Sequence, residues 1–162
     1  MTKPDLKHPA TWIATWFGLG LIPKAPGTWG SIGAIPFIAL CIYFGGVIAL
    51  CAFTLLSTMI GFWAADHFEK QTATHDNKRI VIDEVAGQAL TFLPLFALAP
   101  APSIIHYALG FVLFRAFDIL KPWPVSYCDK HIGGAAGVMI DDLAAGILAG
   151  ICLAGVAYAG LG

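Results

Sequence analysis

The chain has 162 residues, of which 58% are hydrophobic and 12% are charged, and its formal net charge is −1. A typical soluble domain has about 45–50% apolar and about 25% charged residues, so this composition excludes an ordinary small soluble domain and favours lipid as the solvent for much of the chain. A net charge near zero also excludes the basic surface that binds nucleic acid. We expect one membrane-embedded domain that spans residues 1–162.

The charged residues are segregated along the chain. They fall in three islands, at residues 3–24, 66–84 and 115–142. All nine Lys and Arg residues lie in these islands, so we expect the islands to share the cytoplasmic face of a bacterial inner membrane. The chain would then cross or enter the membrane several times through the charge-free stretches, which are residues 25–65, 85–114 and 143–162.

The first charge-free stretch is too long for one span of about 20 residues. Its sequence contains the pair Gly45-Gly46, a plausible break because glycine adopts backbone angles that end a helix. This pattern predicts one helix near residues 31–44 and a second near 46–65.

The second charge-free stretch is interrupted by Pro100 and Pro102, which do not fit inside a helix. The pattern predicts helices near 86–98 and 103–120, and one nearly minimal span at 143–162. The fold class that we expect is all-α: a small integral membrane bundle of two apolar hairpins and a C-terminal transmembrane helix, with the polar loops clustered on one face.

Two pairs of adjacent acids, Asp83–Glu84 and Asp141–Asp142, each stand before an apolar helix. One explanation is structural, because acids in a first turn cap free N–H groups and complement the helix dipole. Two such pairs on one membrane face favour a second explanation, a Mg²⁺ site, because carboxylates, water and substrate phosphate are the usual Mg²⁺ ligands.

Asp118 lies close to the end of its helix, which we expect to stop around Lys121 because Pro122 follows. An acid at this position opposes the helix dipole. An ion pair with Arg115 or Lys121 three residues away would stabilise it only slightly. A role in a site explains the unfavourable position better.

A glycine-rich segment, residues 18–31, contains Lys24, Thr28 and Ser31 and leads into a helix that we expect near Ser31. Free backbone N–H groups at the start of a helix attract phosphate, and the lysine and the two hydroxyls would add donors. Glycine and proline also mark any ordinary loop, so the segment alone allows both interpretations.

Four motifs in a fixed order carry a resemblance to a known family. PKAPGTWGS, IVIDEVAGQ, FRAFDILKPWP and GGAAGVMIDDLAAG resemble the motifs of phosphatidylglycerophosphatase A, a family of bacterial membrane lipid phosphatases. The resemblance runs from about Gly18 to Gly150. It implies hydrolysis of the terminal phosphate of phosphatidylglycerophosphate to give phosphatidylglycerol, a requirement for Mg²⁺, and an inner-membrane location with the active site facing the cytoplasm.

The resemblance, together with the chemistry above, assigns roles to individual residues. The predicted metal ligands are Asp83, Glu84, Asp141 and Asp142, and these four together with Asp118 are the predicted catalytic residues. The predicted substrate-binding residues are Lys24, Thr28, Ser31, Asp76, Arg115 and Lys121. Asp118 would position water or act as a general base; direct attack of an aspartate on phosphorus is the alternative that the sequence leaves open.

A second class of function also fits a set of acids among apolar helices. A small membrane transporter or ion channel could use the clustered acids as a cation site. Transporters, however, place ionisable residues near the middle of the bilayer, whereas these acids stand at the predicted helix ends. The expected partners are phosphatidylglycerophosphate and membrane lipids, with no nucleic acid, and the sequence leaves the oligomeric state open.

Overall fold

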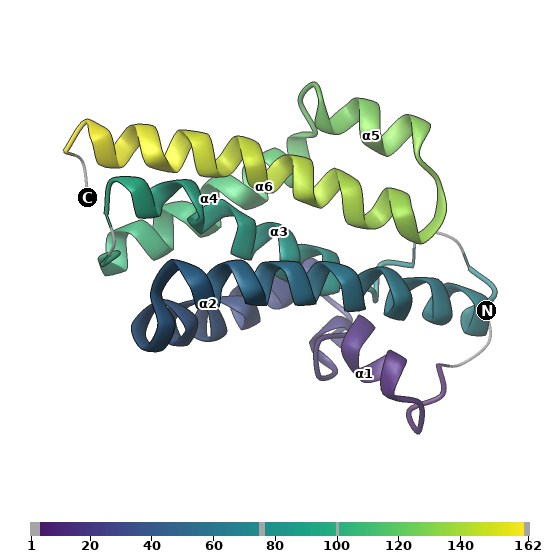
Figure 1. Cartoon of the computed structure of the whole chain (residues 1–162). Coiled ribbons are helices and arrows are strands. Elements are labelled where there is room, and N and C mark those ends of the chain that lie inside the picture. The colour runs from purple at the N-terminus through teal and green to yellow at the C-terminus, as the bar shows by residue number, and fades with distance from the viewer. Residues whose placement is uncertain (1–3, 75–76, 100, 161–162) are drawn as a thin grey trace.

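The computed structural model describes residues 4–74, 77–99 and 101–160. Within these ranges the chain forms helices and no strand, in agreement with the predicted all-α class (Figure 1). In chain order the elements are α1 (Pro9–Ala14), η1 (Leu19–Leu21), α2 (Pro26–Thr72), α3 (Ile82–Phe92), η2 (Pro94–Ala97), α4 (Ile104–Leu120), α5 (Val125–His131) and α6 (Gly134–Tyr158).

Helix α2 consists of two arms that meet at Gly46. This glycine has φ 59° and ψ −147°, outside the helical region, so the predicted break is confirmed. The rings of Phe37 and Phe53, on either side of the break, stack with centroids 6.4 Å apart. A straight helix would separate these residues by about 24 Å, so the two arms pack against each other.

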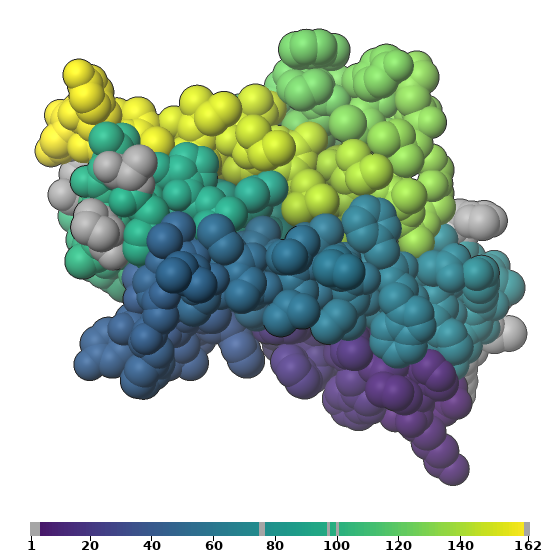
Figure 2. All heavy atoms as spheres, in the orientation of Figure 1, coloured from purple at the N-terminus to yellow at the C-terminus, as the bar shows by residue number. Residues whose placement is uncertain are grey.

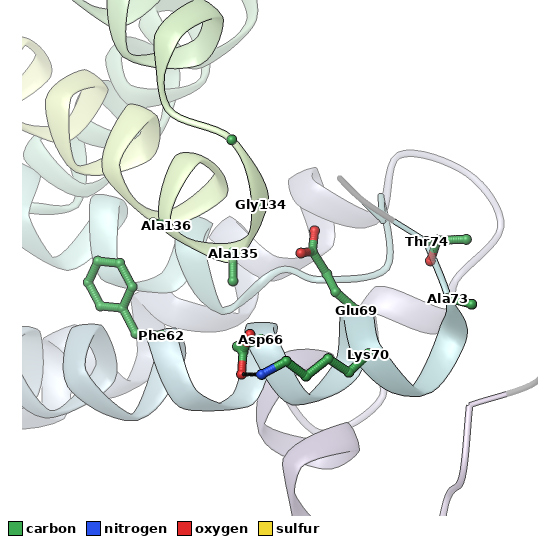
Figure 3. Close-up of a pocket in the computed structure, with 10 residues that line it drawn as sticks. Phe62, Asp66, Glu69, Lys70, Ala73, Thr74, Gly134, Ala135 and Ala136 are labelled. Carbon is green, nitrogen blue, oxygen red and sulfur yellow. Dashed lines mark hydrogen bonds and ion pairs between the residues drawn. The ribbon is translucent and has the colours of Figure 1, made fainter.

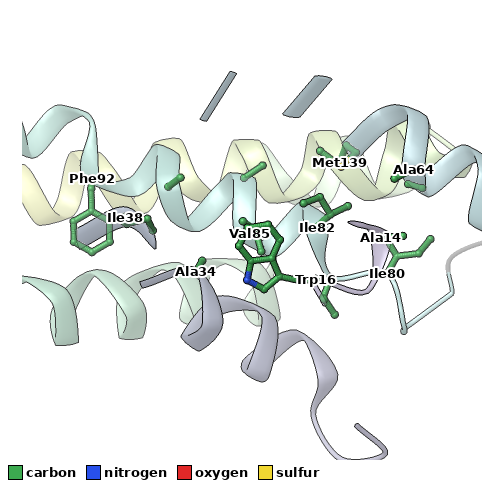
Figure 4. Close-up of a cluster of buried hydrophobic side chains, with 14 of the residues drawn as sticks. Ala14, Trp16, Ala34, Ile38, Ala64, Ile80, Ile82, Val85, Phe92 and Met139 are labelled. Atoms are coloured by element: carbon green, nitrogen blue, oxygen red, sulfur yellow. The ribbon is translucent and has the colours of Figure 1, made fainter. Parts of the chain in front are cut away.

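Helix α3 lies at the centre of the molecule, packed between α2 and α6 (Figure 1). Its buried side chains join those of the neighbouring helices in one core, part of which Figure 4 shows with Ile38, Val85, Phe92 and Met139. A Cβ on Gly146 would overlap the carbonyl oxygen of Gly87. The absence of side chains at these two glycines lets the α3 and α6 backbones approach closely.

Helix α4 begins at a capping box, in which the Ser103 hydroxyl accepts from the backbone N–H of His106 while the His106 side chain accepts from the backbone N–H of Ser103. It ends at Leu120, and Lys121 takes the left-handed conformation with φ 43°. This end agrees with the stop predicted from Pro122.

Many large apolar side chains stay on the outside of the molecule. On the second arm of α2, which crosses the face seen in Figure 2, Ile48 is 79% exposed and Leu55 is 60% exposed. In the part of the chain that the structure describes, two helices are long and apolar enough to cross a membrane, α2 and α6. Exposed apolar patches of this extent are typical of surfaces that contact lipid or another protein.

Several predicted helix boundaries are wrong, each for a physical reason. Helix α2 starts at Pro26, five residues before Ser31, because proline at the first helical position is already in helical geometry. Helix α3 begins at Ile82 and ends before Pro94, so the predicted helix near 86–98 is shifted.

The last helix also starts earlier in the chain than predicted. Helix α6 begins at Gly134, nine residues before the predicted start at 143. Asp141 and Asp142 therefore lie inside a helix and do not cap one. Their charges are accommodated because both carboxylates face the polar cavity described next.

Candidate active site

A polar cavity of about 450 Å³ opens where α2, α3, α4 and α6 meet. It is lined by the start of α2, the first turn of α3, the last two turns of α4 and the second and third turns of α6. Segments that lie far apart in the sequence thus supply one site. The charged side chains that line it are Lys78, Asp83, Glu84, Arg115, Asp118, Lys121, Asp141 and Asp142.

Three acids from two helices converge in this cavity. Asp83, Glu84 and Asp142 each offer one carboxylate oxygen, and these oxygens all lie within 4.8 Å of one another. Asp83 is 6% exposed and Asp142 is 4% exposed. Asp83 Oδ1, Glu84 Oε2 and Asp142 Oδ2 are buried and, among the described residues, have no hydrogen-bond partner.

The acids in the first turn of α3 are held in an environment that disfavours their charge. Burial, followed by the charges of Glu84 and Asp142, raises the pKa of Asp83 well above its usual value. Burial likewise raises the pKa of Glu84 to about 7. A cation bound between the carboxylates would offset both effects.

Two of the basic side chains in the lining, Arg115 and Lys121, form ion pairs with acids. Arg115 Nη1 lies 2.6 Å from Asp118 Oδ2 and 3.6 Å from Glu84 Oε1. Lys121 Nζ pairs with Asp141 Oδ2 at 2.6 Å and also with Asp129. Burial alone would lower the pKa of Lys121, but its hydrogen bonds to these two acids raise it overall. The sequence-based alternative of an Arg115–Asp118 ion pair is therefore present, inside the site.

The two acids on α6 have different surroundings. Residues adjacent in a helix point about 100° apart. Asp142 points toward Asp83 and Glu84, whereas Asp141 bonds to Lys121. The group of possible metal ligands in the described residues consequently contains three of the four predicted acids, without Asp141.

The start of α2 closes one side of the cavity. A Cβ on Gly27 would overlap Glu84 Oε1 and would lie 3.1 Å from Arg115 Nη1. Only a glycine permits α2 to approach these two side chains so closely. The glycine-rich segment therefore has at least one steric role, in addition to the loop and phosphate-binding interpretations considered above.

The predicted phosphate-binding residues of this segment do not line the cavity. Lys24 is exposed just before α2, and Thr28 is partly buried in its first turn. Ser31 is buried and donates its hydroxyl hydrogen bond to Gly27 O, 2.9 Å away. Asp76 lies outside the described residues.

Sequence reasoning did not select one residue that lines the cavity, Lys78, and two that lie beside residues of the cavity, Asp129 and Gln88. Lys78, at the rim, lies in the same segment as Asp83, and its position five residues before that acid could have indicated it. Asp129 on α5 carried no sequence signal, because its contact with Lys121 arises only from the fold. Gln88 is fully buried one turn after Glu84, and its amide atoms have no partner among the described residues.

A second cavity, of about 690 Å³, lies between the end of α2 and the start of α6 (Figure 3). Asp66 and Lys70 form an ion pair at its edge, and the Glu69 carboxylate points toward Gly134. None of the predicted site residues that the structure describes lines this second cavity. The polar cavity is therefore the candidate active site.

The chain is similar to known proteins over nearly its whole length. Residues 12–157 match the family described as phosphatidylglycerophosphatase A. Proteins of that name from Escherichia coli K12 and Haemophilus influenzae Rd are each 36% identical to the chain, over 160 and 158 residues. Each alignment covers 98% of this chain, and 88% and 94% of the two relatives.

A third relative carries a different name. A Bacteroides thetaiotaomicron protein, provisionally named phosphatidylinositol-3-phosphatase, is 37% identical over 147 residues, which are 88% of this chain and 89% of the relative. No solved structure matches the chain.

The family match covers nearly the whole chain and includes every segment that lines the polar cavity. The chain therefore belongs to the phosphatidylglycerophosphatase A family, and it is an enzyme of the phosphoric monoester hydrolase class.

Proposed function

We propose that the protein is a Mg²⁺-dependent lipid phosphatase that hydrolyses the terminal phosphate monoester of phosphatidylglycerophosphate to give phosphatidylglycerol. The observation that carries this proposal is the group formed by Asp83, Glu84 and Asp142, with three buried oxygens that lack partners among the described residues. The family and its two relatives of that name support the choice of substrate.

The donor set of the cavity fits a hard divalent cation. Three carboxylates within 4.8 Å of one another are ligands that Mg²⁺ prefers, and the adjoining cavity leaves room for water and a phosphate oxygen. Asp83, Glu84 and Asp142 would hold the ion, and Asp141 would keep Lys121 in position. When bound, Mg²⁺ would neutralise phosphate charge and polarise the phosphorus–oxygen bonds.

The chain's own residues would bind the head group and move the proton. Arg115 and Lys121 line the cavity and would neutralise the oxygens of the phosphate. Asp118, whose carboxylate Arg115 fixes, would accept a proton from the attacking water. The water oxygen then bonds to phosphorus, the bond from phosphorus to the glycerol oxygen breaks, and that oxygen takes the proton.

The exposed apolar surface supports a multi-pass location in the bacterial inner membrane. Helices α2 and α6 are apolar enough to span it, and the charged islands that surround the cavity would face the cytoplasm. A phosphate site at this boundary is accessible to a lipid head group without any charge entering the bilayer. This position favours hydrolysis over the alternative of transport, because transport requires a polar path through the hydrocarbon.

The decisive experiment is phosphate release by the purified protein in detergent, from phosphatidylglycerophosphate and from phosphatidylinositol 3-phosphate, with Mg²⁺ and with a chelator. We expect Mg²⁺-dependent release that prefers the first lipid. Asp83→Asn should lower the rate at least a hundredfold, because the ligand group loses a charge. Asp66→Asn is the control, since Asp66 forms an exposed ion pair outside the cavity.

Preferential release from the inositol lipid would contradict the proposed substrate but would leave the assignment of the active site unchanged. Full activity of Asp83→Asn would contradict the assignment of the metal site. Absence of release from either lipid, by protein that remains folded, would contradict the phosphatase function and make ion flux in proteoliposomes the next assay.

A further inference from the structure

A third cavity is apolar and lies away from the site. It is a groove of about 700 Å³ between the first arm of α2 and the start of α4, and its lining includes Pro36, Leu40, Tyr43, Pro102 and Tyr107. Its volume is within the range of about 300–1,000 Å³ that is usual for ligand pockets. Among the described residues no charged side chain lines it, so the chemistry of the groove favours an apolar occupant.

The groove and the active-site cavity lie along the same face of α2. Pro26 lines the cavity, and Pro36 and Tyr43 line the groove. Between them, Trp29 and Ile32 are 43% and 41% exposed. These residues follow one another at intervals of three to seven positions, which places them on one side of a helix.

Helix α4 repeats this arrangement in the opposite direction. Tyr107 lines the groove, Arg115 lines the cavity, and the partly exposed Phe111 lies midway between them at intervals of four. Helix α3 contacts both α2 and α4, and its Phe92 ring packs against the Tyr107 ring at a centroid distance of 5.3 Å. A partly exposed apolar track therefore connects the phosphate site to the groove on two helices.

The length of this track matches one leaflet of a membrane. Ten residues separate Pro26 from Pro36, which is about 15 Å along a helix. The hydrocarbon core is about 30 Å thick, so a groove that begins about 15 Å from the cavity begins near the bilayer midplane, where the acyl chains of one leaflet end.

We propose that an acyl chain of the lipid substrate lies along the face shared by the first arm of α2 and α4, and that its end occupies the groove at Pro36, Leu40, Tyr43 and Tyr107. This inference rests on the proposed function, because a phosphorylated head group in the cavity fixes where the chain starts. The groove then discriminates between acyl chains of different length, while the polar cavity binds the head group.

Filling the groove tests this proposal. Ala39 lines the groove, and Ala39→Trp should lower kcat/KM at least tenfold for a substrate with 16-carbon chains and less than twofold for one with 8-carbon chains. Ala52→Trp is the matched control, because Ala52 is exposed on the second arm of α2 and does not line the groove. Equal loss on both substrates, or no loss on either, would overturn the proposal.

A direct probe separates this proposal from the phosphatase function. The wild-type protein is irradiated with phosphatidylglycerophosphate that carries a diazirine at the end of a 16-carbon chain, and the labelled peptides are identified. We expect labels at 36–43 and 101–107, stronger than those from phosphatidylcholine with the same chain. Equal labelling by both lipids would mean that bulk lipid fills the groove and would overturn the inference, whatever the phosphatase assay gives.

Discussion

At the scale of single residues, the acids in the cavity are arranged at the expense of stability. Asp83, Glu84 and Asp142 bring three carboxylates within 4.8 Å of one another, and in the described residues only Glu84 has a basic neighbour, Arg115 at 3.6 Å. Like charges at this distance repel, and burial strengthens the repulsion. Bound cation should therefore stabilise the folded protein as well as support catalysis.

We predict that Mg²⁺ raises the melting temperature of the wild-type protein in detergent and that Asp142→Asn abolishes this rise. A ligand at a hundred times its Kd stabilises a protein by about 2.7 kcal/mol, which corresponds to several degrees. Without Mg²⁺ the variant should melt no lower than the wild type, because one repelling charge is gone. Thermal unfolding with and without Mg²⁺ measures both effects.

The control for this measurement is Asp66→Asn, which should keep the full Mg²⁺-dependent rise because it alters only an exposed ion pair. A rise that persists in Asp142→Asn would place the ion elsewhere. Activity is not needed for the readout, so the metal site is tested apart from the substrate.

The sequence predicted which acids gather in the cavity, but it did not predict which partner each acid has there. From the sequence alone, Asp141 and Asp142 are adjacent aspartates that cannot be told apart. Only the packing of α6 against α3, with Lys121 at the end of α4, turns Asp142 to the acid group and gives Asp141 a basic partner. Gly27 was part of a recognised motif, yet its contact with Glu84 depends on how α2 meets α3.

At the scale of helices, the site depends on how closely α3 and α6 approach. We predict that Gly146→Ala lowers both the melting temperature, by several degrees, and the phosphatase rate, at least tenfold. The added Cβ would overlap Gly87 O, so the helices must separate, which costs about 1–3 kcal/mol and moves Asp142 away from Asp83. Thermal unfolding and phosphate release measure the two effects.

Gly155→Ala provides the matched comparison on the same helix, because a Cβ there meets nothing within 4 Å. It should leave activity unchanged and should stabilise α6 slightly, since alanine favours helix more than glycine does. Wild-type behaviour of Gly146→Ala would mean that the α3–α6 distance does not control the site.

Helix boundaries were predictable where backbone chemistry decides them. Gly46 breaks α2 because glycine allows backbone angles outside the helical region. Pro122 limits α4 because proline disfavours helical angles at the residue before it. The start of α6 was missed because charge was taken to mark a helix end, whereas tertiary partners allow Asp141 and Asp142 inside the helix. Whether a helix tolerates a charged side chain depends on the residues that contact it in the fold, and a single sequence does not show these contacts.

At the scale of the whole molecule, the charged residues around the polar cavity should face water, whereas the exposed apolar surface should face lipid. We predict that a membrane-impermeant maleimide labels Cys128 in inverted inner-membrane vesicles, and labels Cys51 and Cys152 far less. Cys51 and Cys152 are exposed on the protein, but they lie on the apolar helices α2 and α6 and would be covered by lipid. Mass spectrometry of the labelled peptides gives the result.

Detergent-solubilised, denatured protein is the control, in which all three cysteines should react. Labelling of Cys128 from the periplasmic side of sealed cells would reverse the proposed orientation. Strong labelling of Cys51 in intact vesicles would place the second arm of α2 in water and contradict the lipid contact proposed for it.

The break at Gly46 also bears on how the protein is made. Because the chain turns back there, both ends of α2 return toward the same side, and residues 25–65 between them carry no charge. An insertion machinery would therefore not need to move any charged group across the bilayer to place this segment. The two arms could enter lipid together, as one preformed unit, before the acids of the later helices are synthesised.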